Sequence, residues 1–150
     1  MTDFGNGTQS FEQRQSQPTN LAEELFKEWA AKNDIRVYRL GFDEKGERLP
    51  QEHFNLLPEA LRKLPDFVAI GKNRRIVEVK GTPRFKRVDY DLIDERVKLF
   101  HSGESPLFFA FCFRGQEPIW KTPEEVKMLY EAAADQRWDD GVVFRYLRLA

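Results

Sequence analysis

The hydrophobic positions of this chain follow helical spacing in some stretches and strand spacing in others. Residues 1–18 show neither pattern, because they are rich in Gln, Ser, Thr, Gly and Asn and carry few large apolar side chains. A segment of this kind buries little surface, so we predict a flexible tail. Apolar residues then recur along one face of residues 21–32, which predicts an amphipathic helix. The stripe consists of Leu21, Leu25, Phe26 and Trp29.

Residues 19–150 are predicted to form, in order, a helix, three strands, a helix, a strand, a helix and a strand. Strands are expected where β-branched and aromatic residues gather, at residues 35–42, 67–70, 76–79, 107–113 and 142–149. Helices are expected at residues 88–101 and 122–134, the second beginning with a Thr-Pro-Glu-Glu capping sequence. The connections are predicted to be a polar segment at 43–57, a helical turn at 58–64, a basic loop at 81–87 and a turn at 135–141. The strand–helix–strand order across residues 76–113 requires a parallel strand pair, so we predict one α/β domain with a mixed β-sheet flanked by helices.

The hairpin at residues 67–79 carries charged side chains at one of its ends. Glu78 and Lys80 are two residues apart and therefore share one face of their strand. A three-residue loop at residues 71–73 would place Asp66 opposite Glu78, whereas a two-residue loop would put the two acids on opposite faces. Three-residue loops with Gly or Asn in the left-handed conformation are common, which favours the first register. Two converging carboxylates repel each other unless a cation joins them, so the arrangement is typical of a site for a hard metal ion.

The composition narrows the classes of protein that this chain can represent. A length of 150 residues, with 41% hydrophobic and 33% charged residues, is typical of one soluble globular domain. The formal net charge of -1 argues against nucleic-acid binding by overall charge, so phosphate contacts would need a local basic patch. The single cysteine, Cys112, excludes an internal disulfide and lies in an apolar run, where we predict a buried thiol. No apolar run is long enough for a membrane span and no secretory leader is visible, so a cytoplasmic location is expected.

A basic patch of this kind runs from Lys72 to Arg87. The stretch holds seven basic residues and one acid, Glu78. Side chains on such a hairpin and loop can contact the phosphate backbone of a nucleic acid, and these contacts do not read base sequence. The residues assigned to nucleic-acid contact are Lys72, Arg74, Arg75, Arg84, Lys86 and Arg87.

The chain resembles the PD-(D/E)xK nuclease superfamily, which includes restriction enzymes and Holliday-junction resolvases. Pro65-Asp66 matches the first half of the family motif, and Glu78-Val79-Lys80 matches the second half twelve residues later. The family core is a helix, three antiparallel strands, a helix and a strand, and this order matches residues 21–113, about two-thirds of the chain. The resemblance implies a restriction-endonuclease-like fold of core order αβββαβ, here followed by a further helix and strand.

The resemblance also implies a role for each motif residue. Asp66 and Glu78 would hold Mg²⁺ or Mn²⁺, with the Val79 carbonyl as a further ligand. Such a metal ion makes bound water easier to deprotonate and neutralises phosphate charge. Lys80 would orient the nucleophile or bind the scissile phosphate.

Two further residues are implied by the family pattern alone. A glutamate on the first helix often completes the site, and Glu24 is our candidate, because Glu23 lies three residues after Asn20 and is placed to cap that helix. Glu28 is a further acid on the same helix. Tyr90, on the helix after the motif, is a secondary candidate for positioning the phosphate or the lysine.

These features predict a metal-dependent endonuclease that hydrolyses DNA phosphodiester bonds, with plain or branched DNA as its partner. Cutting both strands of a duplex would suit a homodimer. Three alternatives stay open: a nucleic-acid-binding module without catalysis, a ribonuclease, and a protein-interaction domain whose acids are coincidental. Glu78 and Lys80 would then line the solvent face of a half-exposed strand. The intact set of Asp66, Glu78 and Lys80 weighs against a pure binding module, which has no need of paired acids beside phosphate.

Overall fold

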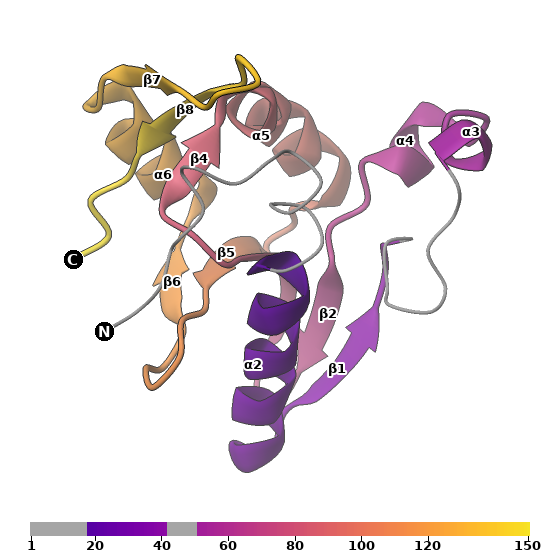
Figure 1. The fold of residues 1–150 in the computed structure, drawn as a ribbon. Helices are drawn as coiled ribbons and strands as arrows, with labels where there is room; N and C mark the ends of the chain where they lie inside the picture. The colour runs from indigo at the N-terminus through magenta and orange to yellow at the C-terminus, as the bar shows by residue number, and fades with distance from the viewer. Residues whose placement is uncertain (1–17, 42–50) are drawn as a thin grey trace.

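The computed structural model describes residues 18–41 and 51–150, which form two β-sheets with helices packed around them (Figure 1). The larger sheet has the strand order β1-β2-β3-β5-β6, and the smaller sheet has the order β4-β8-β7. The strands are β1 (Arg36–Arg39), β2 (Phe67–Ile70), β3 (Arg74–Lys80), β4 (Arg84–Lys86), β5 (Leu107–Phe111), β6 (Ile119–Lys121), β7 (Asp135–Arg137) and β8 (Val143–Tyr146). The helices are α2 (Pro18–Lys32), α3 (Gln51–Phe54), α4 (Glu59–Arg62), α5 (Arg87–Phe100) and α6 (Pro123–Glu131).

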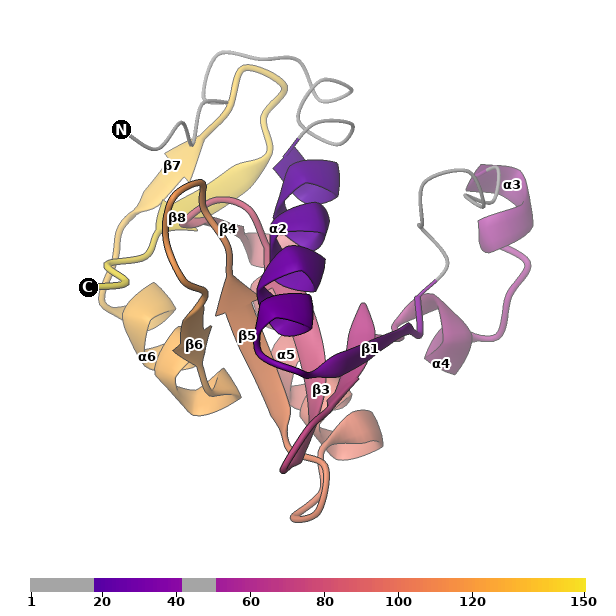
Figure 2. The same ribbon diagram turned by 90° about the horizontal axis from the view of Figure 1, so that it is seen from below.

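Helices cover both faces of the larger sheet. Helix α2 lies on one face, where the fully buried ring of Phe26 stacks on Phe67. On the other face, Ile93 of α5 packs in one apolar cluster with Phe109 and Phe111 of β5. Figure 2 shows α2 in front of β3 and β5, with α5 behind these strands. The apolar run of β5 therefore reflects a strand that is covered on both faces.

The pairing of β2 with β3 has the register that a three-residue loop predicts. The strands are antiparallel, and Ile70 lies opposite Arg74. The loop reaches this register without the expected left-handed residue, because neither Gly71 nor Asn73 has a positive φ. The predicted parallel pair is also confirmed, since β3 and β5 run in the same direction after the crossover through α5.

Three strands and one short helix lie where the sequence predicted loops, turns or no element. β4 lies in the predicted basic loop, β7 in the predicted turn, α3 in the predicted polar connection, and β6 in a stretch without a prediction. Each of these strands has three residues, too few to show alternation, so pairing with β8 or β5 decides its conformation. Phe85 of β4 and Leu147 after β8 join the apolar cluster of α5 and α6. The smaller sheet therefore extends that core rather than standing apart from it.

The boundaries of two helices test the predicted caps. Helix α2 begins at Pro18, so Asn20 lies within its first turn, and the prediction that Glu23 caps the helix with Asn20 is wrong. The capping box of α6 is confirmed, because the side chains of Thr122 and Glu125 each accept a hydrogen bond from the backbone N–H of the other, at 3.1 and 2.9 Å. Residues 1–17 of the predicted tail, and residues 42–50 of the predicted strand and connection, lie outside the described residues.

We expect Phe26→Ala to lower the free energy of unfolding by about 3–5 kcal/mol, because the buried ring packs against Trp29, Phe67 and Trp120. Denaturation in guanidinium chloride, followed by circular dichroism, measures the loss. Leu56→Ala is the control, since Leu56 is 82% exposed, and it should change stability by less than about 0.5 kcal/mol. Equal effects of the two substitutions would show that α2 does not cover the sheet as described.

Candidate active site

The structure brings Asp66 and Glu78 together at one end of the β2–β3 hairpin. Asp66 directly precedes β2, and continuing the pairing of Phe67 with Val77 places it opposite Glu78. The Asp66 side chain crosses to β3, where its Oδ2 accepts a hydrogen bond of 2.8 Å from the Val79 N–H. Both acids are buried, with 8% of Asp66 and 6% of Glu78 exposed. The predicted register is therefore confirmed, and neither acid lines a solvent-facing strand.

Lys80 lies on the same face of β3 as Glu78 and reaches helix α5. Its Nζ is 2.9 Å from Asp89 Oδ2 and 3.8 Å from Glu78 Oε2. Burial alone would lower the pKa of Lys80, but the charges of Asp89 and Glu78 outweigh burial and hold this pKa above its ordinary value. Burial likewise opposes ionisation of Asp89, yet the charge of Lys80 holds the pKa of Asp89 below its ordinary value. Both side chains are therefore charged at neutral pH.

Arg96 of α5 brings a second cation to the same place. Its Nη1 lies 3.1 Å from Glu78 Oε2, and its Nε donates a hydrogen bond of 3.0 Å to the backbone carbonyl of Lys63. Arg96 is 8% exposed, so this contact is shielded from water. Asp89, Lys80, Glu78 and Arg96 thus form a continuous chain of ion pairs between β3 and α5.

Asp89 and Arg96 were not among the predicted site residues, although the sequence carries a signal for both. They are seven residues apart, about two helical turns, and so lie on the same face of α5 as the buried Ile93. A charged residue in line with buried apolar positions indicates a partner of opposite charge across the interface. The identity of that partner depends on where α5 crosses β3, which the pattern does not reveal.

The donor atoms at this end of the hairpin fit a hard cation. Glu78 Oε1 is buried and has no hydrogen-bond partner among the described residues. The N–H and C=O of a strand residue face the same neighbouring strand, so the Val79 carbonyl lies on the side where its N–H meets Asp66. Two carboxylates and a carbonyl suffice for Mg²⁺, which uses one or two protein carboxylates and keeps waters. Arg96 occupies the other oxygen of Glu78, and within residues 18–41 and 51–150 no three His, Cys, Asp or Glu side chains form a metal-binding group.

The glutamates of α2 do not join this site. Glu24 is exposed, because it lies roughly 200° around the helix from the buried Ala22. Glu23 is the buried acid, 4% exposed, and it forms an ion pair with Arg39. The Arg39 guanidinium lies 4.5 Å from the ring centre of Phe67, on the α2 face of the sheet. Asp66 and Glu78 face α5, so the sheet separates them from Glu23. The exposed position of Glu24 does not support the expectation that this residue completes the site.

Tyr90 also points away from Lys80. Its ring stacks on Tyr130 of α6, with ring centres 4.1 Å apart and planes 14° apart, and its hydroxyl donates to Glu131. Tyr90 follows Asp89 by one residue, so the turn of the helix directs the two side chains to different neighbours. Tyr90 therefore connects α5 to α6, and the expectation that it positions phosphate or lysine is not supported.

The predicted nucleic-acid residues fall into two groups at opposite ends of β3. The strand runs from Arg74 to Lys80, about 20 Å at about 3.3 Å per residue. Lys72, Arg74 and Arg75 lie at the loop end of the hairpin, where Arg74 pairs with Glu104 at 3.0 Å. The second group, on β4 and at the start of α5, consists of Arg84, Lys86 and Arg87. The single patch read from the sequence is therefore two patches in space.

Replacing Arg96 by Met should lower the free energy of unfolding by about 3 kcal/mol, because it leaves the buried Glu78 without its nearest cation. The double variant Arg96→Met/Glu78→Gln should recover part of that loss, measured by guanidinium chloride denaturation. Lys127→Met is the matched control, since its ion pair with the exposed Asp94 should be worth less than about 1 kcal/mol. Similar losses in Arg96→Met and Lys127→Met would contradict a buried chain of ion pairs.

We expect the stability difference between the wild type and Asp89→Asn to shrink as the pH falls. The charge of Lys80 lowers the pKa of Asp89 in the folded protein, so the contribution of Asp89 is present above the ordinary carboxyl pKa and is lost as the pH falls through the folded pKa. The pKa of Lys80 is raised, so the contribution of Lys80 persists until the pH rises through that raised pKa. Denaturation at several values between about pH 2 and pH 7 tests this. A stability difference between the two proteins that is independent of pH would show that Lys80 does not lower the pKa of Asp89.

No family model, curated protein or solved structure matches this chain. The relation to the PD-(D/E)xK superfamily therefore stays a prediction from the motif residues and the order of elements. Within the described ranges, no helix combines the length and apolar character of a membrane-spanning segment. What the structure establishes is a mixed α/β architecture with a mixed sheet between helices.

Proposed function

We propose that this protein is a metal-dependent nuclease that hydrolyses phosphodiester bonds in DNA inside the cell. The observation that carries the proposal is the placement of Asp66 opposite Glu78, with Lys80 beside them on the same face. A buried oxygen of Glu78 that lacks a hydrogen-bond partner among the described residues supports a cation at this point. A structural pair of acids would need no such open oxygen.

The chain supplies the ligands and a fixed positive charge for this reaction. Asp66, Glu78 and the Val79 carbonyl would hold Mg²⁺ or Mn²⁺. When bound, the ion stabilises negative charge on the phosphate and makes a coordinated water easier to deprotonate. Lys80 stays protonated at neutral pH, because its pKa is raised, so it would act as an electrostatic partner of the scissile phosphate rather than as a general base. To do so, its ammonium group would exchange part of its contact with Asp89 for the substrate.

The second basic group supports a substrate that continues past this site. Arg84 and Lys86 lie on β4, and Arg87 is exposed at the first position of α5. All three follow Lys80 within seven residues of the chain. Contacts of this kind bind the phosphate backbone beside the cut and do not depend on base sequence.

A second candidate function is a nucleic-acid-binding module without catalysis. The observation in its favour is that Lys80 and Glu78 already have protein partners, Asp89 and Arg96. In this alternative the four charges only fasten α5 to β3. The module would bind DNA through its basic groups and would not cut it with any metal ion.

Cleavage assays with and without Mn²⁺ separate these functions. Asp66→Asn, Glu78→Gln and Lys80→Ala should each slow cleavage by at least about 100-fold, because each removes a ligand or the charge beside the phosphate. Glu24→Gln is the matched control and should cut normally, since Glu24 is exposed on α2. The substrates are labelled duplex, single-stranded, flap and four-way-junction DNA, with single-stranded RNA to test the ribonuclease alternative.

The cleavage and binding results distinguish the nuclease from the binding module. Metal-dependent cutting that survives in Glu24→Gln and is lost in the three site variants supports the nuclease. DNA binding without cutting at any metal concentration supports the binding module. Cutting that is unchanged by Glu78→Gln would place the active site elsewhere.

A further inference from the structure

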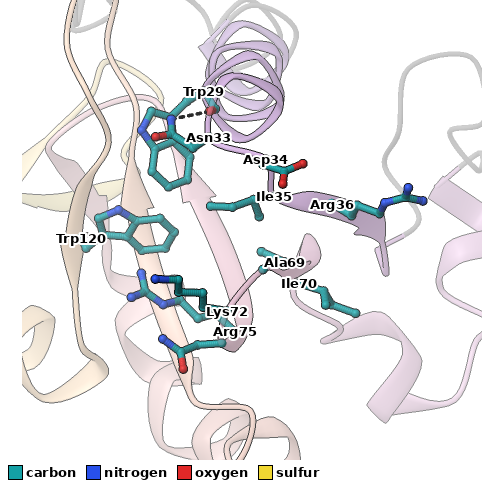
Figure 3. Close-up of a pocket in the computed structure, with 12 residues that line it drawn as sticks. Trp29, Asn33, Asp34, Ile35, Arg36, Ala69, Ile70, Lys72, Arg75 and Trp120 are labelled. Atoms are coloured by element: carbon teal, nitrogen blue, oxygen red, sulfur yellow. Dashed lines mark hydrogen bonds between the residues drawn. The ribbon is translucent and has the colours of Figure 1, made fainter.

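A large pocket opens at the loop end of the β2–β3 hairpin, far from Glu78 and Lys80. It has a volume of about 1000 Å³ and is formed by the end of α2, the start of β1, the hairpin and β6 (Figure 3). It lies on the α2 face of the sheet, because Arg75, which lines it, pairs with Ala69 of the α2 cluster. The candidate active site lies on the other face, at the opposite end of β3. The pocket is therefore separate from the candidate active site.

Two tryptophans form one wall of this pocket. Trp29 and Trp120 are both half-buried, and their ring centres are 5.6 Å apart with planes at 61°. Trp29 Nε1 is buried without a hydrogen-bond partner among the described residues. Ile35 and Ala69 add apolar surface next to the rings. A flat apolar ligand with hydrogen-bonding edges would match this wall.

Two cations lie on the same side of the pocket. The Arg75 guanidinium is held 4.7 Å from the ring centre of Trp120 and 4.8 Å from that of Phe108. Figure 3 shows Lys72 and Arg75 toward Trp120, whereas Arg36 extends away from it. In the described part of the chain, neither Lys72 nor Arg75 forms an ion pair with a carboxylate.

The charged residues around Arg75 and Lys72 leave the pocket with a net positive charge. Arg74, the next residue on β3, faces the other side of the sheet and is already paired with Glu104. Among the described residues that line the pocket, Asp34 is the one acid, against the three cations Arg36, Lys72 and Arg75. The pocket therefore combines an aromatic wall with excess positive charge that is not neutralised within the described chain.

We propose that this pocket binds one unpaired nucleotide, with its base against Trp29 and Trp120 and its phosphate on Arg75 and Lys72. Aromatic rings and guanidinium planes stack on any base, and guanidinium donors match phosphate oxygens. Bases within a duplex are already stacked and cannot enter, so the pocket selects single-stranded or splayed nucleic acid, or a free nucleotide. This inference rests on the proposed nuclease function in one respect, namely that the protein binds nucleic acid. Binding in the pocket requires neither a metal ion nor Glu78.

Intrinsic fluorescence provides a direct test, because two of the three tryptophans line the pocket. The full chain is titrated in EDTA with oligothymidylate about 15 nucleotides long, and separately with thymidine 5′-monophosphate. We expect quenching in the wild type. Arg75→Gln should weaken oligonucleotide binding about 10-fold and reduce the slope of log affinity against log salt by about 0.7.

The matched control is Arg114→Gln, which removes the same charge from an exposed turn position between β5 and β6. It should change the affinity by less than about twofold, because Arg114 does not line the pocket. Lys72→Gln, at an exposed turn position, repeats the test without disturbing the rings that Arg75 packs on. Circular dichroism confirms that each variant is folded.

Each outcome decides the proposal. Quenching by one or both ligands that is lost in Arg75→Gln and Lys72→Gln but kept in Arg114→Gln supports the pocket. The ligand that quenches then shows whether a strand or a free nucleotide binds there. No quenching, or equal losses in Arg114→Gln and Arg75→Gln, overturns the proposal. Glu78→Gln separates the two proposals, because this variant should retain the quenching while losing cleavage. Quenching without any cleavage by the wild type would refute the nuclease and leave the pocket intact.

Discussion

Helix α5 covers two charged side chains of β3, the buried Glu78 and the half-buried Lys80, and much of the remaining structure follows from this contact. Taking charged groups out of water costs several kcal/mol for each, and the cost is offset only when partners of opposite charge lie close by. Asp89 and Arg96 provide these partners from one face of α5, at 2.9 and 3.1 Å. The helix must therefore cross β3 in one orientation. That orientation is compatible with the parallel return of the chain into β5.

The two faces of the larger sheet have different chemistry. The α5 face combines an apolar cluster around Phe109 and Phe111 with the chain of ion pairs. The α2 face has an aromatic cluster, in which Phe26 contacts the rings of Trp29 and Trp120. Cys112 also lies in the cluster on this face. Burial raises the pKa of the Cys112 thiol to about 12, so the thiol is unreactive at neutral pH. The chain of ion pairs thus lies where catalysis is proposed, and the tryptophan rings lie where a base is proposed to bind.

The cations of the two proposed sites differ in whether they form ion pairs with acids of the described chain. Lys80 and Arg96 are neutralised by acids of the same chain, so a substrate phosphate must compete with those acids. Arg75 is held over aromatic rings and forms no ion pair with a carboxylate of the described residues. A nucleic acid that occupied both places would span opposite faces and opposite ends of β3. Such a path suits a substrate in which one strand separates from its complement, because separated strands can follow different faces.

The order of the main elements and the register of the β2–β3 hairpin could be predicted from the sequence. Both depend on local properties, namely hydrophobic period, capping residues and loop length, and the pairing of Ile70 with Arg74 confirms the loop length. The short strands, the burial of Glu23 in place of Glu24, and the partners of Lys80 and Glu78 depend on tertiary contacts. Each of these depends on which distant segment lies beside it, and neither residue spacing nor composition carries that information.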